Sequence, residues 1–114
     1  MTKQDADCCS PLVREPLSEV QAVELSTMFK AVADPVRLRL LSLIASHDGG
    51  EACVCELTGT FALTGPTISH HLKVLRESGL ITGERRGTWI YYRAEPAALA
   101  RLAAVLDTPQ AASA

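Results

Sequence analysis

Residues 64–93 read TGPTISHHLKVLRESGLITGERRGTWIYYR, and the rest of the chain is best understood as support for this unit. Its apolar residues Ile68, Leu72 and Leu75 recur at the spacing of one helix face, which predicts a helix over residues 66–78, ended by a glycine. The runs 80–82 and 89–93 are rich in β-formers and flank a charged turn that contains a glycine. The stretch therefore predicts a helix followed by a β-hairpin.

Three helices are expected before this unit and one after it. Ser18 with Gln21 forms a capping-box pattern at the start of the first, and Asp34-Pro35 supplies the N-cap and first position of the second. Glycines at 49–50 end the second helix, the third spans Glu51 to Ala62, and the last opens at Pro96. The order α-α-α-α-β-β-α predicts an α+β, mainly α, winged helix-turn-helix fold. The apolar faces assigned to these four helices comprise Val20, Val23, Met28 and Val32 in the first, Leu38, Leu41 and Ile44 in the second, Val54, Leu57 and Phe61 in the third, and Leu99, Leu102, Val105 and Leu106 in the last.

The 114 residues suit a single domain. We expect a flexible, cysteine-bearing arm over residues 1–16, a folded domain over 17–107 and a disordered tail over 108–114. The arm is polar and acidic, and no apolar run approaches the ~20 residues that a membrane-spanning helix needs. These features predict a cytoplasmic protein without a membrane partner.

The net charge of −2 argues against a generally basic nucleic-acid binder, so any DNA contact needs a local patch. Such a patch lies in the central unit. Helical geometry turns Thr67, His70 and Lys73 away from the apolar face, with Ser69 and Arg76 on one flank and His71 on the other. The hairpin tip adds Arg85 and Arg86, which suit phosphate contacts. A solvated helix face is the alternative interpretation of the pattern, and His71 also fits a packed structural histidine.

The four cysteines fall into two pairs, Cys8 with Cys9 in the arm and Cys53 with Cys55 at the expected start of the third helix. In a cytoplasmic protein, paired thiols indicate a soft ion more than a disulfide framework. Residues two apart on a regular helix point about 200° apart, so Cys53 and Cys55 share an ion only if the helix start is distorted. We expect the arm thiols plus one of the helix pair, with Cys55 favoured. The alternative for Cys53 or Cys55 alone is a small buried apolar residue.

Three blocks of this sequence resemble the ArsR/SmtB family of metal-sensing repressors. They are FKAVADPVRL at 29–38, EACVCEL at 51–57, and GPTISHHLKVL at 65–75 followed by Gly79-Leu80. Arg86-Gly87 and Tyr91-Tyr92 resemble the wing of that family. The resemblance spans residues 18–106, and its cysteine block is that of the arsenic- and cadmium-sensing members.

The resemblance implies a homodimer built through the first and last helices, bound to an inverted-repeat operator of a resistance operon. It implies release by As(III) or Sb(III) on cysteine thiolates, with Cd(II) or Pb(II) as the alternative ions and no organic cofactor. Both cysteines of the Cys-Val-Cys box are then candidate ligands. Zinc sensors of the family use histidines and acidic residues on the last helix. His47, His70 and His71 all lie elsewhere, and Glu95 with Asp107 alone would make a poor zinc site, so no metal site is expected there.

Two other functions remain open from the residues alone. The same cysteines suit a thiol-redox repressor, which oxidation releases from DNA without an ion. A thiol enzyme is disfavoured, because Glu51 and Glu56 flank Cys53 with the wrong charge for a nucleophile and no phosphate-binding loop is present.

Overall fold

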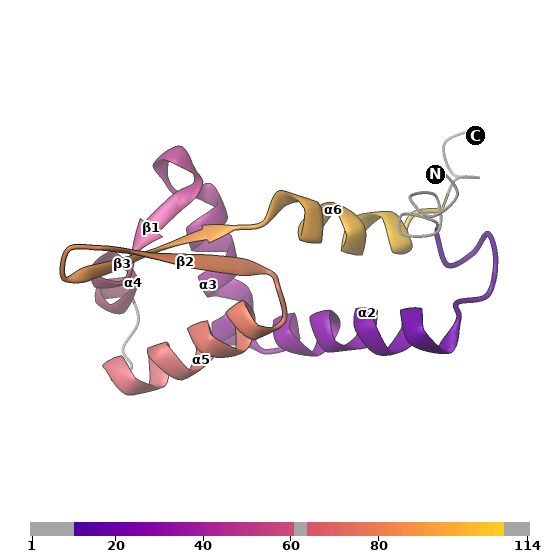
Figure 1. Cartoon of the computed structure of the whole chain (residues 1–114), viewed down its shortest axis with the longest axis horizontal. Coiled ribbons are helices and arrows are strands. Elements are labelled where there is room, and N and C mark those ends of the chain that lie inside the picture. Colours follow the sequence, from indigo (N-terminus) through magenta and orange to yellow (C-terminus); the bar gives the residue numbers. More distant parts are fainter. Residues whose placement is uncertain (1–10, 61–63, 109–114) are drawn as a thin grey trace.

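We describe a computed structural model of the chain, covering residues 11–60 and 64–108. Its helices and strands follow one another along the chain as seen in Figure 1. In order they are α2 (Glu19–Val32), α3 (Pro35–Ser46), the short 3-10 helix η1 (Asp48–Gly50), β1 (Glu51–Cys53), α4 (Val54–Thr60), α5 (Gly65–Glu77), β2 (Ile81–Arg86), β3 (Trp89–Ala94) and α6 (Pro96–Val105). The winged helix-turn-helix prediction is confirmed, with one additional strand.

The starts of the first two helices follow from local side-chain capping. The Ser18 hydroxyl accepts a hydrogen bond from the Gln21 backbone N–H at 3.1 Å, and the Gln21 side chain accepts one from the Ser18 N–H at 2.9 Å. The Asp34 carboxylate accepts from the backbone N–H groups of Val36 and Arg37, and Pro35 takes the first helical position. These bonds satisfy N–H groups that have no partner within the helix. Both predicted caps are confirmed.

The additional strand corrects the prediction of a helix from Glu51 to Ala62. Residues 51–53 instead form the edge strand of an antiparallel sheet with the order β1-β3-β2, and α4 begins at Val54. Cys53 pairs with Tyr91 on β3, and Ala52 is fully buried opposite Tyr92. Pairing with a strand almost forty residues away therefore overrides the local helical pattern at this point.

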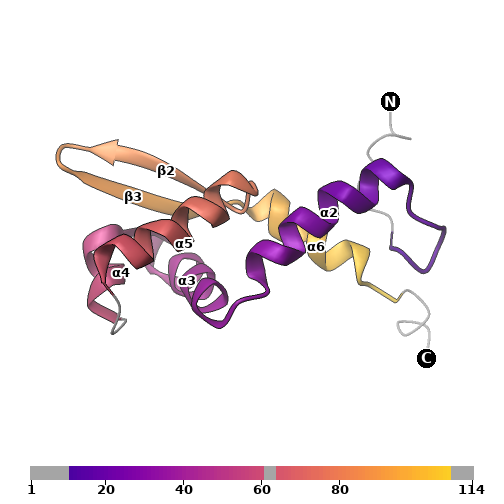
Figure 2. The same ribbon diagram turned by 90° about the horizontal axis from the view of Figure 1, so that it is seen from below.

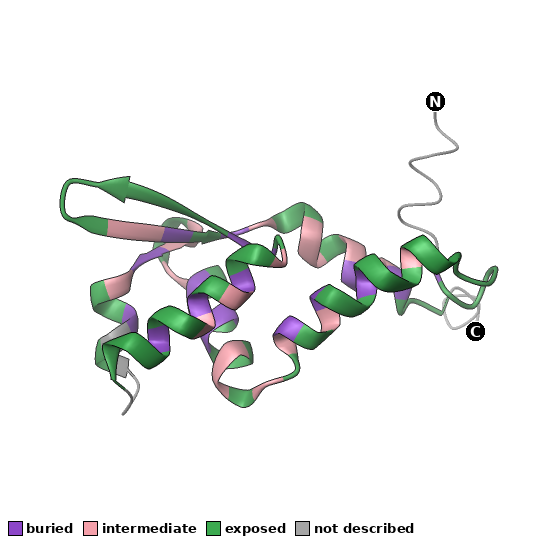
Figure 3. Cartoon of the chain, turned by 60° about the horizontal axis from the view of Figure 1, so that its bottom comes forward, coloured by how far each residue is buried: buried purple, intermediate pink, exposed green. Residues whose placement is uncertain are grey.

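The core lies where α3, α5 and the sheet meet. Its fully buried large side chains are Leu40, Ile44, Ile68, Leu72, Leu75, Leu80 and Ile81. Figure 3 shows buried positions alternating with exposed ones along α5. The predicted face of α3 was partly wrong, because Leu38 is 55% exposed and Leu40 takes the central place.

Helices α2 and α6 contact each other at the end of the molecule opposite the β2–β3 hairpin (Figures 1 and 2). Arg101 of α6 forms an ion pair with Glu24 of α2 at 2.9 Å. The α2 side chains that face the core are Leu25, Met28 and Ala31. Val20 and Val23, which were assigned to the apolar face of this helix, are 67% and 61% exposed, so the residues that the structure describes leave that part of the face uncovered.

Candidate thiol site and DNA-reading face

Helix α5 presents a polar outer face. Thr64 caps its start, accepting a hydrogen bond from the Thr67 N–H at 3.3 Å. The helix then buries Ile68, Leu72 and Leu75, as the periodicity predicted. The predicted reading residues Thr67, Ser69, His70, Lys73 and Arg76 are all exposed. Hydroxyl, imidazole and cationic groups on one exposed face are the groups that contact bases and phosphates in a major groove.

His71 differs from these reading residues because it is half-buried and turned toward α3. Its Nδ1 lies 3.3 Å from a terminal nitrogen of Arg37. Since a guanidinium only donates, this Nδ1 is the acceptor. Arg37 also donates through Nε to the Ala31 carbonyl at 2.6 Å and through Nη2 to the Lys30 carbonyl at 3.4 Å. His71 thus belongs to a bridge that joins the end of α2 to α5.

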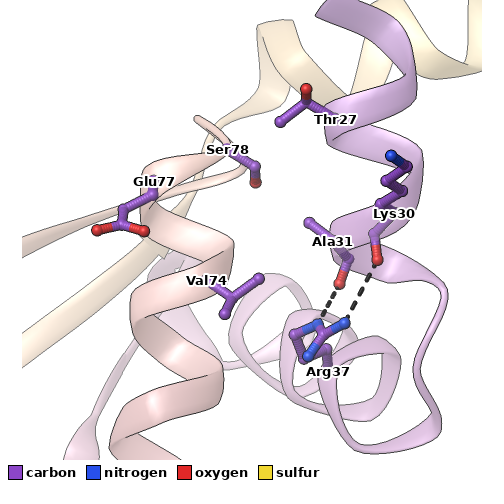
Figure 4. Close-up of a pocket in the computed structure, with 7 residues that line it drawn as sticks. All are labelled: Thr27, Lys30, Ala31, Arg37, Val74, Glu77 and Ser78. Carbon is purple, nitrogen blue, oxygen red and sulfur yellow. Dashed lines mark hydrogen bonds between the residues drawn. The ribbon is translucent and has the colours of Figure 1, made fainter.

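A small cavity lies beside this bridge, between α2 and the C-terminal half of α5 (Figure 4). It has a volume of about 300 Å³. Its lining comprises Thr27, Lys30, Ala31, Arg37, Val74, Glu77 and Ser78. The dashed lines in Figure 4 mark the bonds from Arg37 to the two carbonyls that end α2.

The two arginines of the hairpin tip have different surroundings. Arg86 binds Glu51 through both terminal nitrogens, at 2.6 and 3.1 Å, and also pairs with Glu84 at 2.8 Å. Its guanidinium lies over the Tyr91 ring, 4.6 Å from the centroid. Arg85 is exposed and forms no ion pair with any residue in 11–60 or 64–108. Of the two predicted DNA contacts, only Arg85 therefore presents an unengaged charge.

Glu51 links the start of β1 to both strands of the hairpin. It accepts from Arg86 on β2 and, at 2.8 Å, from Arg93 on β3. The hydrogen bond from Arg86 is the main cause that holds the pKa of Glu51 below its usual range, and Glu51 in turn raises the pKa of Arg86. β1 and the hairpin are therefore connected by charge as well as by the strand ladder.

Cys53 and Cys55 converge, contrary to the geometry expected for a continuous helix. Cys53 ends β1 with 3% of its surface exposed, while Cys55 is exposed in the first turn of α4. The chain changes from strand to helix between them, the Cα atoms lie 5.2 Å apart, and the two Sγ atoms are joined as a disulfide. The sequence allowed the two sulfurs to meet only if the start of the helix was distorted, and the change from strand to helix at Val54 is such a distortion.

Hydrogen bonds fix the corner between β1 and α4. The Cys55 N–H donates to the Cys53 Sγ at 3.2 Å, and the Cys53 N–H donates to Glu56 Oε1 at 2.8 Å. This resembles a capping box in which a cysteine replaces serine or threonine. Glu56 Oε2 lies 3.2 Å from Nε2 of His47, the residue that ends α3.

The chemistry of the pair suits a soft ion. Two sulfur donors at one point bind thiophilic ions and bind hard cations poorly. No cluster of three or more metal-ligating side chains occurs within the described ranges. Cys8 and Cys9, predicted as such donors, lie outside the described residues.

Sequence reasoning missed Glu56, His47, Glu51 and Arg37 as parts of these sites. A signal existed for Glu56, which stands three residues after Cys53 as in a capping box. No local signal marks the Glu51–Arg86 pair, whose members are 35 residues apart in the chain. His47 and Arg37 likewise acquire partners only in the folded chain.

We call the junction of β1 and α4, with Cys53, Cys55 and Glu56, the cysteine corner. Together, the exposed helix α5, the hairpin and this corner define a winged helix-turn-helix regulator. The model of the family described as "Bacterial regulatory protein, arsR family" matches residues 34–82. The arsenical resistance operon repressor of Escherichia coli is 40% identical over 80 residues, which cover 70% of this chain and 67% of that protein. The chain therefore belongs to the arsR family of bacterial regulatory proteins, whose members matched here are transcriptional regulators and not enzymes.

Two further similarities refine this placement. The arsenic resistance transcriptional regulator ArsR1 of Pseudomonas putida is 49% identical over 69 residues, and the match spans 60% of this chain but only 52% of that protein. The crystal structure of the AntR antimony-specific transcriptional repressor superposes with a TM-score of 0.65 at 30% identity, covering 79% of this chain and 80% of that one. In residues 11–60 and 64–108 no helix is both long and apolar enough to cross a membrane.

Proposed function

We propose that this protein is a dimeric transcriptional repressor that leaves its operator when As(III) or Sb(III) binds its cysteine thiolates. The observation that carries the proposal is the position of the Cys53–Cys55 pair. It lies where a strand of the wing sheet meets the first helix of the helix-turn-helix. The relatives named for arsenic and antimony support these ions over Cd(II) and Pb(II).

Ion capture requires the reduced pair. Arsenite exchanges its three hydroxyls for three thiolates, As(OH)₃ + 3 RSH → As(SR)₃ + 3 H₂O. Cys53 and Cys55 supply two sulfurs, and Cys8 or Cys9 of the arm supplies the third. In the cytoplasm, where we place the protein, thiols are kept reduced and available.

The length of the arm bears on which subunit supplies the third sulfur. The Leu12 N–H donates to the Val105 carbonyl at the end of α6 at 2.8 Å, so residue 12 is held at the α2–α6 end of the molecule. Three or four residues reach on the order of 10–15 Å from there. Figure 1 places β1 at the other end of the molecule. The arm therefore completes the site of a partner subunit more readily than its own.

The dimer is supported by the uncovered apolar surface at this same end. Exposed there are Leu12, Val13, Leu17, Val20, Val23 and Leu106. A second copy related by a two-fold axis covers such a face, and the same axis sets two α5 helices for an inverted repeat.

Release of DNA follows from the two connections of the cysteine corner. An ion that engages the Cys53 sulfur competes with the hydrogen bond from the Cys55 N–H, which disturbs the start of α4. A shift of Cys53 on ion binding also displaces β1. This strand is paired to β3 and joined through Glu51 to Arg86, so the displacement reaches the hairpin. An almost complete shift from bound to released requires about 5.5 kcal/mol of differential ion affinity.

The experiment is a fluorescence-anisotropy titration of reduced protein on DNA from its own promoter, at fixed salt, with increasing arsenite. We expect release by the wild type and retention by the variant in which all four cysteines become serine. A Cys8→Ser/Cys9→Ser variant tests the arm separately. Release that persists in the four-serine variant contradicts the proposal. Release by Cd(II) or Pb(II) at lower concentration than arsenite instead assigns the sensor to those ions.

A second candidate function is redox sensing, and the adjacency of the two sulfurs favours it. Two thiols form a disulfide by giving two electrons and two protons to an oxidant such as hydrogen peroxide, which becomes two waters. A metal-free titration with peroxide distinguishes the two candidates. Release by peroxide and its reversal by dithiothreitol support the redox sensor, and continued binding excludes it.

A further inference from the structure

Glu56 and His47, which are not among the proposed ion ligands, connect the cysteine corner to the end of α3. Glu56 accepts from the Cys53 N–H with one carboxylate oxygen, at 2.8 Å, and contacts His47 Nε2 with the other, at 3.2 Å. The sulfurs themselves are held to each other across only one intervening residue.

His47 is oriented to serve this contact. Its Nδ1 is buried and has no hydrogen-bond partner among the described residues. The Glu56 carboxylate only accepts, so Nε2 of His47 is the donor in this contact. His47 ends α3, whose inner face is part of the core, so the contact connects the corner to a rigid element.

We propose that Glu56, held by His47, is a positioning residue for ion capture. It fixes the backbone of Cys53 so that the two thiols stay close together once the disulfide is reduced and before the ion arrives. This inference rests on the proposed function, in which the pair binds the ion. A pre-organised pair loses less conformational entropy when the ion binds, so its affinity for the ion is higher.

The alternative role for Glu56 is that of an ordinary helix cap without influence on the sulfurs. The two roles differ in what they predict. A cap alone changes the stability of α4 and leaves the affinity of the folded pair for an arsenical unchanged. A positioning residue changes the affinity in folded protein.

The test uses phenylarsine oxide, which takes two thiols, PhAsO + 2 RSH → PhAs(SR)₂ + H₂O. In the full chain with Cys8→Ser/Cys9→Ser, only Cys53 and Cys55 remain to bind it. The variants are Glu56→Ala, Glu56→Gln, Glu56→Asp and His47→Ala, with Glu77→Ala as the matched control on an exposed glutamate of α5. Affinity is measured without DNA, under reducing, oxygen-free conditions, from the near-ultraviolet sulfur-to-arsenic absorbance, and circular dichroism checks the fold.

We expect Glu56→Ala to weaken binding about tenfold, because the Cys53 N–H loses its hydrogen bond to a charged group. We expect His47→Ala to weaken it about threefold, because Glu56 loses the contact that holds it in place. Glu56→Gln keeps an acceptor for the Cys53 N–H but turns an N–H2 group toward His47, so we expect a loss of about threefold, as in His47→Ala. Glu77→Ala is expected to bind like the parent. If Glu56→Ala does not fold, Glu56→Asp takes its place, since the shorter side chain cannot reach both partners.

Equal affinity in the parent and the Glu56→Ala (or Glu56→Asp) variant overturns the positioning role, and so does an equal loss in Glu56→Gln. These results leave the proposed function intact, provided that the parent binds the probe. A parent that does not bind phenylarsine oxide contradicts the proposed function itself, so the two failures are distinguishable.

Discussion

At the scale of single residues, the clearest electrostatic feature away from the candidate site is Asp34. The backbone N–H of Arg37 is the main cause that lowers the pKa of this carboxyl below the ordinary value of 3.8, and the Arg37 charge and the Val36 N–H act in the same direction. The ionised carboxylate therefore interacts more favourably with the folded chain than with the unfolded one. Its contribution is complete above the unfolded pKa and is lost as the pH falls through the folded pKa.

This sign gives a test in Asp34→Asn. Asparagine caps helices about as well as aspartate but carries no charge. We expect the urea midpoint of the wild type to fall more steeply below about pH 4 than that of the variant, while the two converge at the acidic end. The measurement is urea unfolding by circular dichroism between pH 2.5 and 6. Parallel curves would mean that Asp34 is not the source of the dependence.

At the scale of elements, the two arginines of the hairpin tip differ in their surroundings. Arg86 is engaged by Glu51, Glu84 and the ring of Tyr91, whereas Arg85 is exposed beside it. A phosphate contact needs a cation without an ion-pair partner. A residue that holds two strands together needs a cation that is already bound to a carboxylate. The wing thus has one residue suited to each role.

We expect Arg85→Ala to weaken binding to all DNA sequences and to lower the slope of log affinity against log salt by about one. Arg86→Ala should leave that slope unchanged and lower the thermal midpoint of unfolding, because Glu51 loses a bidentate partner. Salt-dependent anisotropy with each variant checks both expectations. A slope change in Arg86→Ala would show that this residue exchanges Glu51 for phosphate on DNA.

At the scale of the whole molecule, the two ends differ in the elements and in the exposed side chains that they carry. One end carries the sheet, the cysteine corner and the hairpin, and the other carries α2 and α6 with their uncovered apolar side chains (Figure 2). In the function proposed above, a dimer serves both to read an inverted repeat and to complete the ion site.

A charge on the uncovered face tests this arrangement. Val23 is 61% exposed in the single chain, so Val23→Glu is compatible with the fold but places a carboxylate in the expected dimer interface. We expect a monomer by analytical ultracentrifugation, with near-native circular dichroism and at least tenfold weaker operator binding. Glu19→Gln, on the exposed start of the same helix, is the control. A Val23→Glu dimer would place the interface elsewhere.

Local patterns were sufficient for much of the fold. Capping by Ser18 and Asp34 acts within three residues, and the apolar face of α5 repeats over three turns, so both were predicted correctly. The exposed face of α5 followed from the same periodicity. The choice of Leu40 over Leu38 as a core residue was not predictable in this way, because α3 is apolar on more than one side and only its packed neighbours select the buried one.

The sequence by itself determined the order of the helices, the hairpin, the exposed polar face of α5 and the pairing of the cysteines along the chain, because those features arise from near neighbours. Only the tertiary structure decided that residues 51–53 form a strand, that the sulfurs of Cys53 and Cys55 meet, and that Arg86 is bound to Glu51. A three-residue strand is too short to show a period, and its hydrogen bonds come from β3, whose residues lie about forty positions further along the chain.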